Sequence, residues 1–141
     1  MVTTKLSERN DVGQALWTLI DNSKYRMRIG LIYAPQENKT LNKDLQKIYQ
    51  EIEEQAKAAT ENNEMLMVMD DFNCKVGEVI PGNSGTVNKG GRLLTQMTGK
   101  NNMIIMNAEE VCQGLWTRQQ GEENSVIDYV LMTYEDAHKI K

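Results

Sequence analysis

The stretch MLMVMDDFNCKVG, residues 65–77, constrains the fold most, because five apolar residues run directly into two aspartates, an aromatic residue and an asparagine. A short continuous apolar run is typical of a strand that is covered on both faces of a sheet. In open α/β sheets, ligand-binding side chains gather at the carboxyl ends of strands, where the backbone leaves the core. We therefore expect a buried strand that carries Asp70, Asp71 and Asn73 to one edge of a sheet.

Two adjacent carboxylates repel each other, so a half-buried pair favours a bound cation or a set of hydrogen-bond donors. The alternative for these residues alone is a solvated turn that ends the strand and has no further role. Local spacing by itself therefore does not identify an enzyme.

The segments around this stretch alternate between strand and helix patterns. Residues 14–20 and 25–35 predict a hairpin with DNSK as its turn, and Pro35 ends the second strand because proline cannot donate to a ladder. The remaining expected elements are a helix over 41–59, a glycine-dense loop over 77–91, a short helix over 92–102, a strand over 103–108, and two strands within 114–133 joined by QQGEEN. This order predicts a mixed α/β sandwich with helices packed on sheet faces.

Composition narrows the class of protein. The 141 residues, 40% of them hydrophobic, suit one domain, and a net charge of −4 gives no overall positive field that would hold nucleic acid non-specifically. Cys74, Cys112 and His138 have no zinc-ligand spacing, so reduced thiols are expected. No apolar run reaches the roughly 20 residues of a membrane span, and the N-terminal residues lack the apolar core of a signal peptide. We expect an intracellular protein that does not span a membrane.

Four segments in a fixed order carry a family resemblance. MVMDDFNCKVG resembles the Gly-Asp-Phe-Asn signature of the endonuclease/exonuclease/phosphatase superfamily, and particularly the apurinic-type endonuclease domain of non-LTR (LINE-like) retrotransposons. IGLIYAP resembles the family's tyrosine-bearing strand, GGRLLTQMTGKNNMIIMNA the helix and strand after the signature, and WTRQQGEENSVIDYVLM its tryptophan strand and Ile-Asp-Tyr segment. The resemblance covers residues 14–133. It implies a DNase I-like fold, a mixed two-sheet sandwich flanked by helices, of which residues 1–141 form a single partial domain.

The resemblance also implies roles for four residues. Asp71 stands at the signature aspartate, which activates or orients the attacking water, and is the expected ligand of Mg²⁺ or Mn²⁺. Asn73 matches the asparagine that hydrogen-bonds the scissile phosphate, and Tyr33 the tyrosine that stabilises phosphate charge. Asp128 matches the aspartate that orients a catalytic histidine.

The function implied is divalent-metal-dependent phosphodiester hydrolysis by a DNA-nicking endonuclease of the retrotransposon type, with DNA as partner and the nucleus as a candidate location. The alternative is a truncated or domesticated derivative without catalysis that serves as a binding or interaction module. A phosphatase acting on inositol phosphates or another small phosphoester is a third reading within the same superfamily.

Departures from the family pattern favour the non-catalytic alternative. Asp70 replaces the signature glycine, and Leu115 precedes Trp116 where many relatives carry a polar residue. The family's early asparagine and metal-binding glutamate have no counterpart, and Asp136 and His138 do not match the spacing of its terminal histidine segment. A sandwich without its first strands exposes a face or an edge, so self-association or a protein partner is expected.

A local phosphate-facing patch would have to come from a few cations spread along the chain, with a solvated surface as the ordinary role for most of them. The candidates are Arg26, Arg28, Lys75, Lys89, Arg92 and Arg118.

Overall fold

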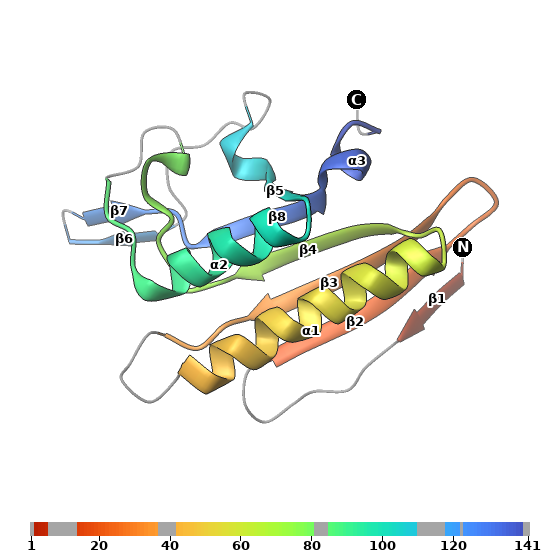
Figure 1. The fold of residues 1–141 in the computed structure, drawn as a ribbon, viewed down its shortest axis with the longest axis horizontal. Helices are drawn as coiled ribbons and strands as arrows, with labels where there is room; N and C mark the ends of the chain where they lie inside the picture. The colour runs from red at the N-terminus through yellow and green to blue at the C-terminus, as the bar shows by residue number, and fades with distance from the viewer. Residues whose placement is uncertain are drawn as a thin grey trace.

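The computed structural model describes residues 2–5, 14–36, 42–80, 85–109, 118–121 and 123–139 (Figure 1). Its centre is a six-stranded mixed sheet in the order β1-β2-β3-β4-β8-β5, and β6 and β7 form a separate two-stranded ribbon. The strands are β1 Val2–Lys5, β2 Gln14–Asp21, β3 Arg26–Tyr33, β4 Met65–Asp71, β5 Met103–Ile105, β6 Arg118–Gln120, β7 Glu123–Ser125 and β8 Asp128–Thr133. The α-helices are α1 Asn42–Glu61, α2 Lys89–Lys100 and α3 Tyr134–Ala137, and Gly77–Val79 and Met106–Ala108 form 3₁₀ turns.

The predicted hairpin is confirmed, since β2 and β3 pair antiparallel along their whole length. Asn22 explains the tight turn between them, because its side-chain oxygen accepts hydrogen bonds from the backbone N–H groups of Lys24 and Tyr25 at 2.8 and 2.9 Å. This Asx arrangement is the reason that asparagine favours turns.

The first long helix is also confirmed, and α1 lies over the β2–β3–β4 part of the sheet (Figure 1). It connects β3 to β4, which pair in parallel. Its buried residues recur at helical spacing, as expected for one apolar face: Leu45, Ile48, Tyr49, Ile52, Ala56 and Ala59. Trp17 of β2 is completely buried beneath it and donates its indole N–H to Glu51 at 2.8 Å. Gly30 of β3 makes room for that ring, since a Cβ there would lie 2.4 Å from it.

The second helix begins earlier than the sequence indicated. α2 starts at Lys89 rather than Arg92, so Gly90 and Gly91 are helical and not part of the preceding loop. The physical reason is close packing: a Cβ on Gly91 would lie 1.8 Å from the carbonyl oxygen of Lys75. In the sequence, Gly90 and Gly91 suggest a loop. In the structure they lack a Cβ where α2 packs closely against the segment after β4, and so they allow that packing.

Short elements account for the other differences. β1 and α3 were not anticipated, and the strand predicted over 103–108 ends at Ile105 and continues as a 3₁₀ turn. The sequence predicted two strands near the C-terminal end, but the structure has three. β6 and β7 form the two-stranded ribbon, and β8 follows as a separate strand of the main sheet. Residues 110–117, with Cys112, Leu115 and Trp116, lie outside the described residues.

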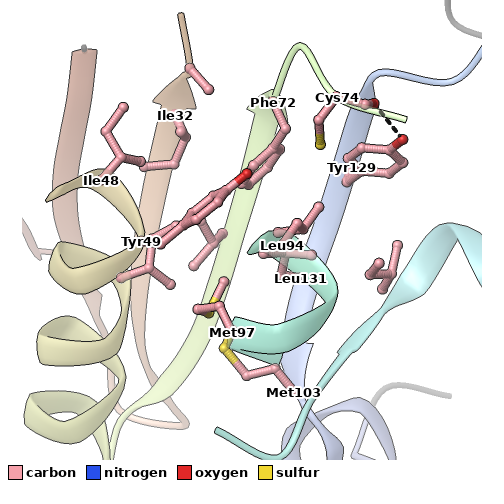
Figure 2. Packing of buried hydrophobic residues seen from close by; sticks show 14 of the residues in the cluster. Ile32, Ile48, Tyr49, Phe72, Cys74, Leu94, Met97, Met103, Tyr129 and Leu131 are labelled. Atoms are coloured by element: carbon pink, nitrogen blue, oxygen red, sulfur yellow. Dashed lines mark hydrogen bonds between the residues drawn. The ribbon is translucent and has the colours of Figure 1, made fainter. Parts of the chain in front are cut away.

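The two faces of the main sheet differ in burial. The face beneath α1 and α2 is dry, with Ile32, Leu66, Val68 and Leu131 at 0% exposure, and Figure 2 shows how Tyr49 and Leu94 pack toward it. We call the other face the open face. Its members, read from strand alternation and register, are Leu16, Thr18, Ile20, Met27, Ile29, Leu31, Tyr33, Met65, Met67, Met69, Asp71, Ile104, Asp128, Val130 and Met132. Most of them are partly exposed, but Met132 is only 1% exposed.

One prediction about the sheet needs correction, and a second is not confirmed. β4 was expected to be covered on both faces, but only Leu66 and Val68 are fully buried, while Met65, Met67 and Met69, which alternate with them, are partly exposed. The two-sheet sandwich is not confirmed, because among the described residues the second sheet is the short β6–β7 ribbon. In the described part of the chain no helix is long and apolar enough to cross a membrane.

Candidate active site

Three of the four predicted site residues form a row across neighbouring strands at the carboxyl end of β4. Asp71 of β4 is the register partner of Asp128 of β8, and residues directly opposite each other in an antiparallel pair have side chains on the same face. Leu31 of β3 is level with Met69, and the N–H of Ala34 donates to the carbonyl of Asp71 at 2.8 Å. Tyr33 therefore lies level with Asp71. We call Tyr33, Asp71 and Asp128 the carboxyl-end row.

Asn73 joins this row through hydrogen bonds on both sides. Its backbone N–H donates to Oδ1 of Asp71 at 2.8 Å, and its side-chain amide donates to the carbonyl of Ala34 at 2.7 Å. Its φ of 45° is left-handed, which asparagine tolerates better than most residues. A side-chain amide has two N–H donors, so one bond to Ala34 leaves a second donor for another acceptor. The structure thus brings all four predicted site residues to one end of the sheet.

The segment that follows Asn73 is fixed by groups that the sequence analysis did not single out. Asn88 caps α2, and its Oδ1 accepts from the N–H of Gly91 at 2.9 Å and from that of Lys75 at 3.0 Å. The hydroxyl of Tyr129 lies 2.8 Å from the carbonyl oxygen of Cys74 (Figure 2) and 2.7 Å from that of Val126. An asparagine three residues before a glycine at a helix start is a capping signal that could have identified the first of these contacts.

Burial keeps two phenols of this region neutral. Desolvation raises the pKa of Tyr129 well above its ordinary value of 10, and the neighbouring Cys74 and Asp128 raise it further. Desolvation likewise raises the pKa of Tyr49, again with a contribution from Cys74, and the Tyr49 hydroxyl donates to the carbonyl of Gly90 at 3.2 Å. Both phenols therefore act as uncharged hydrogen-bonding groups. Tyr129 holds the segment after Asn73 in place, and Tyr49 holds the start of α2.

Asp70 stands where the Gly-Asp-Phe-Asn signature that this segment resembles has glycine, and its backbone has a conformation that glycine adopts freely. Its φ is 105°, a region that other L-residues rarely enter. Holding a non-glycine residue there costs about 1–3 kcal/mol. The side chain is exposed, so the added charge is solvated rather than buried beside Asp71.

The oxygen atoms of the carboxyl-end row suit a hard cation. Mg²⁺ is commonly held by one or two carboxylates together with waters and substrate phosphates, which matches the Asp71–Asp128 pair. Within the described residues there is no group of three or more histidine, cysteine, aspartate or glutamate side chains that could hold a metal ion.

Two of the candidate phosphate-binding cations belong to the other end of the sheet. Arg28 is only 9% exposed, and its Nε lies 2.7 Å from Glu64. Arg26 pairs with Asp21 at 3.1 Å and with Glu64 at 3.4 Å. Since Met27 and Met65 are register partners, these arginines lie at the amino end of β4 and build the fold there, away from the row.

Three other cations lie near the carboxyl end of β4. Lys75 follows the Asn73 segment, its carbonyl accepts from the N–H of Asn88, and Lys89 and Arg92 occupy the first turn of α2 beside it. The side chain of Arg118 lies outside the described residues. Lys75, Lys89 and Arg92 are thus the cations that the fold places near the carboxyl end of β4.

The C-terminal Asp136 and His138 are remote from the row. Asp136 is buried at the amino end of β4, where it accepts a hydrogen bond from the N–H of Leu66 at 3.1 Å. Leu66 and Asp71 are five residues apart on one strand, which places them roughly 16 Å apart at 3.3 Å per residue. His138 makes an edge contact with Tyr134, with ring centroids 4.4 Å apart. Among the described residues, then, no histidine stands beside Asp128.

Comparison with known proteins supports the fold. No family model matches the sequence, and no curated protein matches it. Among solved structures, the chain is similar to the endonuclease domain of TRAS1, a telomere-specific non-LTR retrotransposon, with a TM-score of 0.55 and 16% sequence identity. The match covers 86% of this chain and 51% of that domain, so the chain spans about half of its length. The chain has a distant endonuclease-like α/β fold.

Proposed function

We propose that the carboxyl end of β4 is a site of divalent-metal-dependent phosphodiester hydrolysis, and that the chain contributes to DNA nicking of the retrotransposon type. The observation that carries this proposal is the convergence of Tyr33, Asp71, Asn73 and Asp128 from three strands and one turn. The fold that the chain shares with a retrotransposon endonuclease domain supports the same reading.

Each residue has a chemical task in this proposal. Phosphodiester hydrolysis builds negative charge on the non-bridging oxygens, and a bound Mg²⁺ or Mn²⁺ would supply neutralisation of that charge. Asp71 and Asp128 would hold the cation, and Asp71 would also orient the attacking water. The hydroxyl of Tyr33, a residue that is 51% exposed, and the second amide N–H of Asn73 would donate to phosphate oxygens.

The role of Asp128 differs here from the one that the resemblance implied. Orienting a histidine requires a histidine beside it, and His138 lies at the other end of the strand. Asp128 is instead the register partner of Asp71. A shared cation would reduce the repulsion between two carboxylates that lie directly opposite each other in a strand pair.

A second candidate function is binding without catalysis. This function is favoured by the small number of acidic side chains at the site, since the described residues offer a pair of carboxylates rather than a larger group of metal-ligating side chains. In that case Lys75, Lys89 and Arg92 would contact a phosphate backbone while the row remained chemically inert. The two functions differ in whether a strand is cut.

The test is nicking of supercoiled plasmid by the purified chain with Mg²⁺ or Mn²⁺, beside an EDTA control. Asp71→Asn keeps the shape of the side chain and removes its charge. Asp21→Asn is the matched control, because Asp21 also ends a strand but pairs with Arg26 at the opposite end of the sheet.

Catalysis predicts open-circle DNA with wild type and with Asp21→Asn, and none with Asp71→Asn or with EDTA. Equal cutting by wild type and Asp71→Asn contradicts the assigned role of Asp71. A folded wild-type chain that retards DNA in a gel without cutting it selects the binding function instead.

A further inference from the structure

The segment that follows β4 turns alternate side chains into the core. Three of its residues are almost completely buried, and Figure 2 labels the first two: Phe72, Cys74 and Val76. Asp71, Asn73 and Lys75 alternate with them and are partly exposed. The Cα atoms of Asn73 and Lys75 are at most about 7 Å apart, because two residues separate them. Lys75 is therefore the next partly exposed side chain after Asn73, beside the carboxyl-end row.

Asn88 holds the backbone of Lys75 on both sides. Its Oδ1 accepts from the N–H of Lys75 at 3.0 Å, and its own N–H donates to the carbonyl of Lys75 at 3.2 Å. Val76 and Val87, the next residues outward, form an isolated antiparallel bridge. The peptide groups on either side of the Lys75 Cα are thus fixed, and with them the point from which the side chain starts.

The same oxygen of Asn88 ties Lys75 to α2. It also accepts from the N–H of Gly91 at 2.9 Å, so one side chain serves both the helix and the segment after Asn73. The close packing of Gly91 on the Lys75 carbonyl leaves no room for the segment to move toward the helix. A cation on a backbone that is already ordered loses less conformational entropy when it binds a ligand.

We propose that Asn88 is a positioning residue, which holds Lys75 so that its ammonium group binds the DNA backbone beside the phosphate at Asn73. This inference rests on the proposed function, since it takes DNA as the ligand. The chain has a net charge of −4, so its contact with a phosphate backbone depends on where individual cations are placed. A lysine two residues from Asn73, with both of its backbone groups bonded, is such a placement.

A helix cap without this second role would behave differently. Loss of a cap lowers the stability of α2 but leaves the number of cations on the DNA backbone unchanged. The salt dependence of binding reports that number, because each neutralised phosphate releases counterions. The slope of log K against log salt therefore separates a positioning role of Asn88 from a purely structural one.

The test measures binding of a short, fluorescently labelled DNA duplex by anisotropy at several salt concentrations, in EDTA to prevent cutting. Lys75→Gln should weaken binding about tenfold, since it removes one bond to a charged group, and should reduce the slope by about 0.9. Asn88→Gly keeps Lys75 but removes the oxygen that holds it, and glycine is a tolerated cap. This variant should weaken binding severalfold and should also reduce the slope.

The combined variant shows whether Asn88 acts through Lys75. In the Lys75→Gln background, Asn88→Gly should have no further effect on affinity, because residues that act through one contact are not additive. Asn88→Ser is a second variant, since serine caps helices as well as asparagine does. Its shorter side chain does not reach from Gly91 to Lys75, so α2 should keep its stability while the slope falls.

The matched control is Lys100→Gln, which removes a cation from the last turn of α2, where it pairs with Glu53 at 3.3 Å. It should leave the slope unchanged, and circular dichroism should show all variants folded. Three results would overturn the proposal: no binding of the duplex by wild type, an unchanged slope in the Asn88 variants, or effects of Asn88→Gly and Lys75→Gln that add fully. Binding by a chain that leaves plasmid uncut would overturn only the proposed catalysis, since these results concern binding.

Discussion

Both ends of β4 carry acidic side chains, but the two ends surround those side chains with different chemistry. At the amino end, Glu64 lies 2.7 Å from Arg28 and 3.4 Å from Arg26, and Asp136 accepts from the backbone of β4. At the carboxyl end, Asp71 is the register partner of another aspartate and accepts from the N–H of Asn73. The amino end places acids against bases and so stabilises the fold, whereas the carboxyl end places two aspartates opposite each other, where we propose a cation site.

The largest effect should come from breaking the amino end. Glu64→Gln leaves the guanidinium of Arg28 buried without its charged partner, which costs about 3–5 kcal/mol of unfolding free energy. Chemical denaturation measures the loss. Glu53→Gln, which removes the exposed pair with Lys100, is the control and should cost less than about 1 kcal/mol. Similar losses for the two variants would contradict a structural role for the buried pair.

The close approach of α2 to the Asn73 segment should be the next most sensitive feature. Gly91→Ala introduces a Cβ 1.8 Å from the Lys75 carbonyl, so α2 must move, and we expect a loss of about 3 kcal/mol. Gly99→Ala lies in the same helix with no atom within 4 Å and should raise stability by about 0.5–1 kcal/mol. If the two variants changed stability in the same direction, the close packing of Gly91 against Lys75 would not be what holds the segment after Asn73 against α2.

Alkaline pH should loosen the carboxyl end through its buried phenols. The folded pKa values of Tyr49 and Tyr129 lie above 10, so their stabilising contribution is complete below pH 10 and is lost as pH rises above it. With two such groups, the unfolding free energy should fall by about 2.7 kcal/mol per pH unit in that range. Urea unfolding at several pH values measures the slope, and Tyr129→Phe should halve it. A flat profile from pH 9 to 11 would show that these phenols ionise without unfolding.

The smallest effect concerns Asp70. Asp70→Gly relieves the strain at φ 105°, and after the extra flexibility of glycine in the unfolded chain is subtracted, stability should rise by about 1 kcal/mol. Asp70→Ala removes the charge and keeps the strain, so it should change stability little. A gain with alanine equal to that with glycine would mean that charge repulsion, rather than the backbone, disfavours aspartate there.

Local sequence patterns predicted the parts of this fold that depend on local rules. The β2–β3 hairpin follows from alternation and an Asx turn, and α1 follows from apolar residues at helical spacing. The start of α2 could not be predicted, because Gly90 and Gly91 are helical for a reason that lies 15 or more residues away, at Cys74 and Lys75. Tertiary contact overrode the usual meaning of a glycine pair.

The sequence also predicted only part of the candidate site. The four residues taken from the family resemblance do converge, since they sit at ends of strands that pair. Arg26 and Arg28 were only candidates for a phosphate patch, and the structure places both beside Glu64 instead. The sequence could not predict this pairing, because Glu64 is 36 or more residues away from each arginine. The two-sheet sandwich stays unconfirmed, since strand patterns cannot say what covers the open face.

The most direct test of the contrast between the two ends is Mn²⁺ titration followed by NMR of the backbone amides, since Mn²⁺ broadens the signals of nearby nuclei. We expect the signals of Tyr33, Asp71, Asn73 and Asp128 to broaden first, while those of Glu64 and Asp136 stay sharp. Asp71→Asn should abolish the effect in an otherwise unchanged spectrum. Broadening that begins at the amino end, or that persists undiminished in Asp71→Asn, would contradict the assignment of the cation site to the carboxyl end of β4.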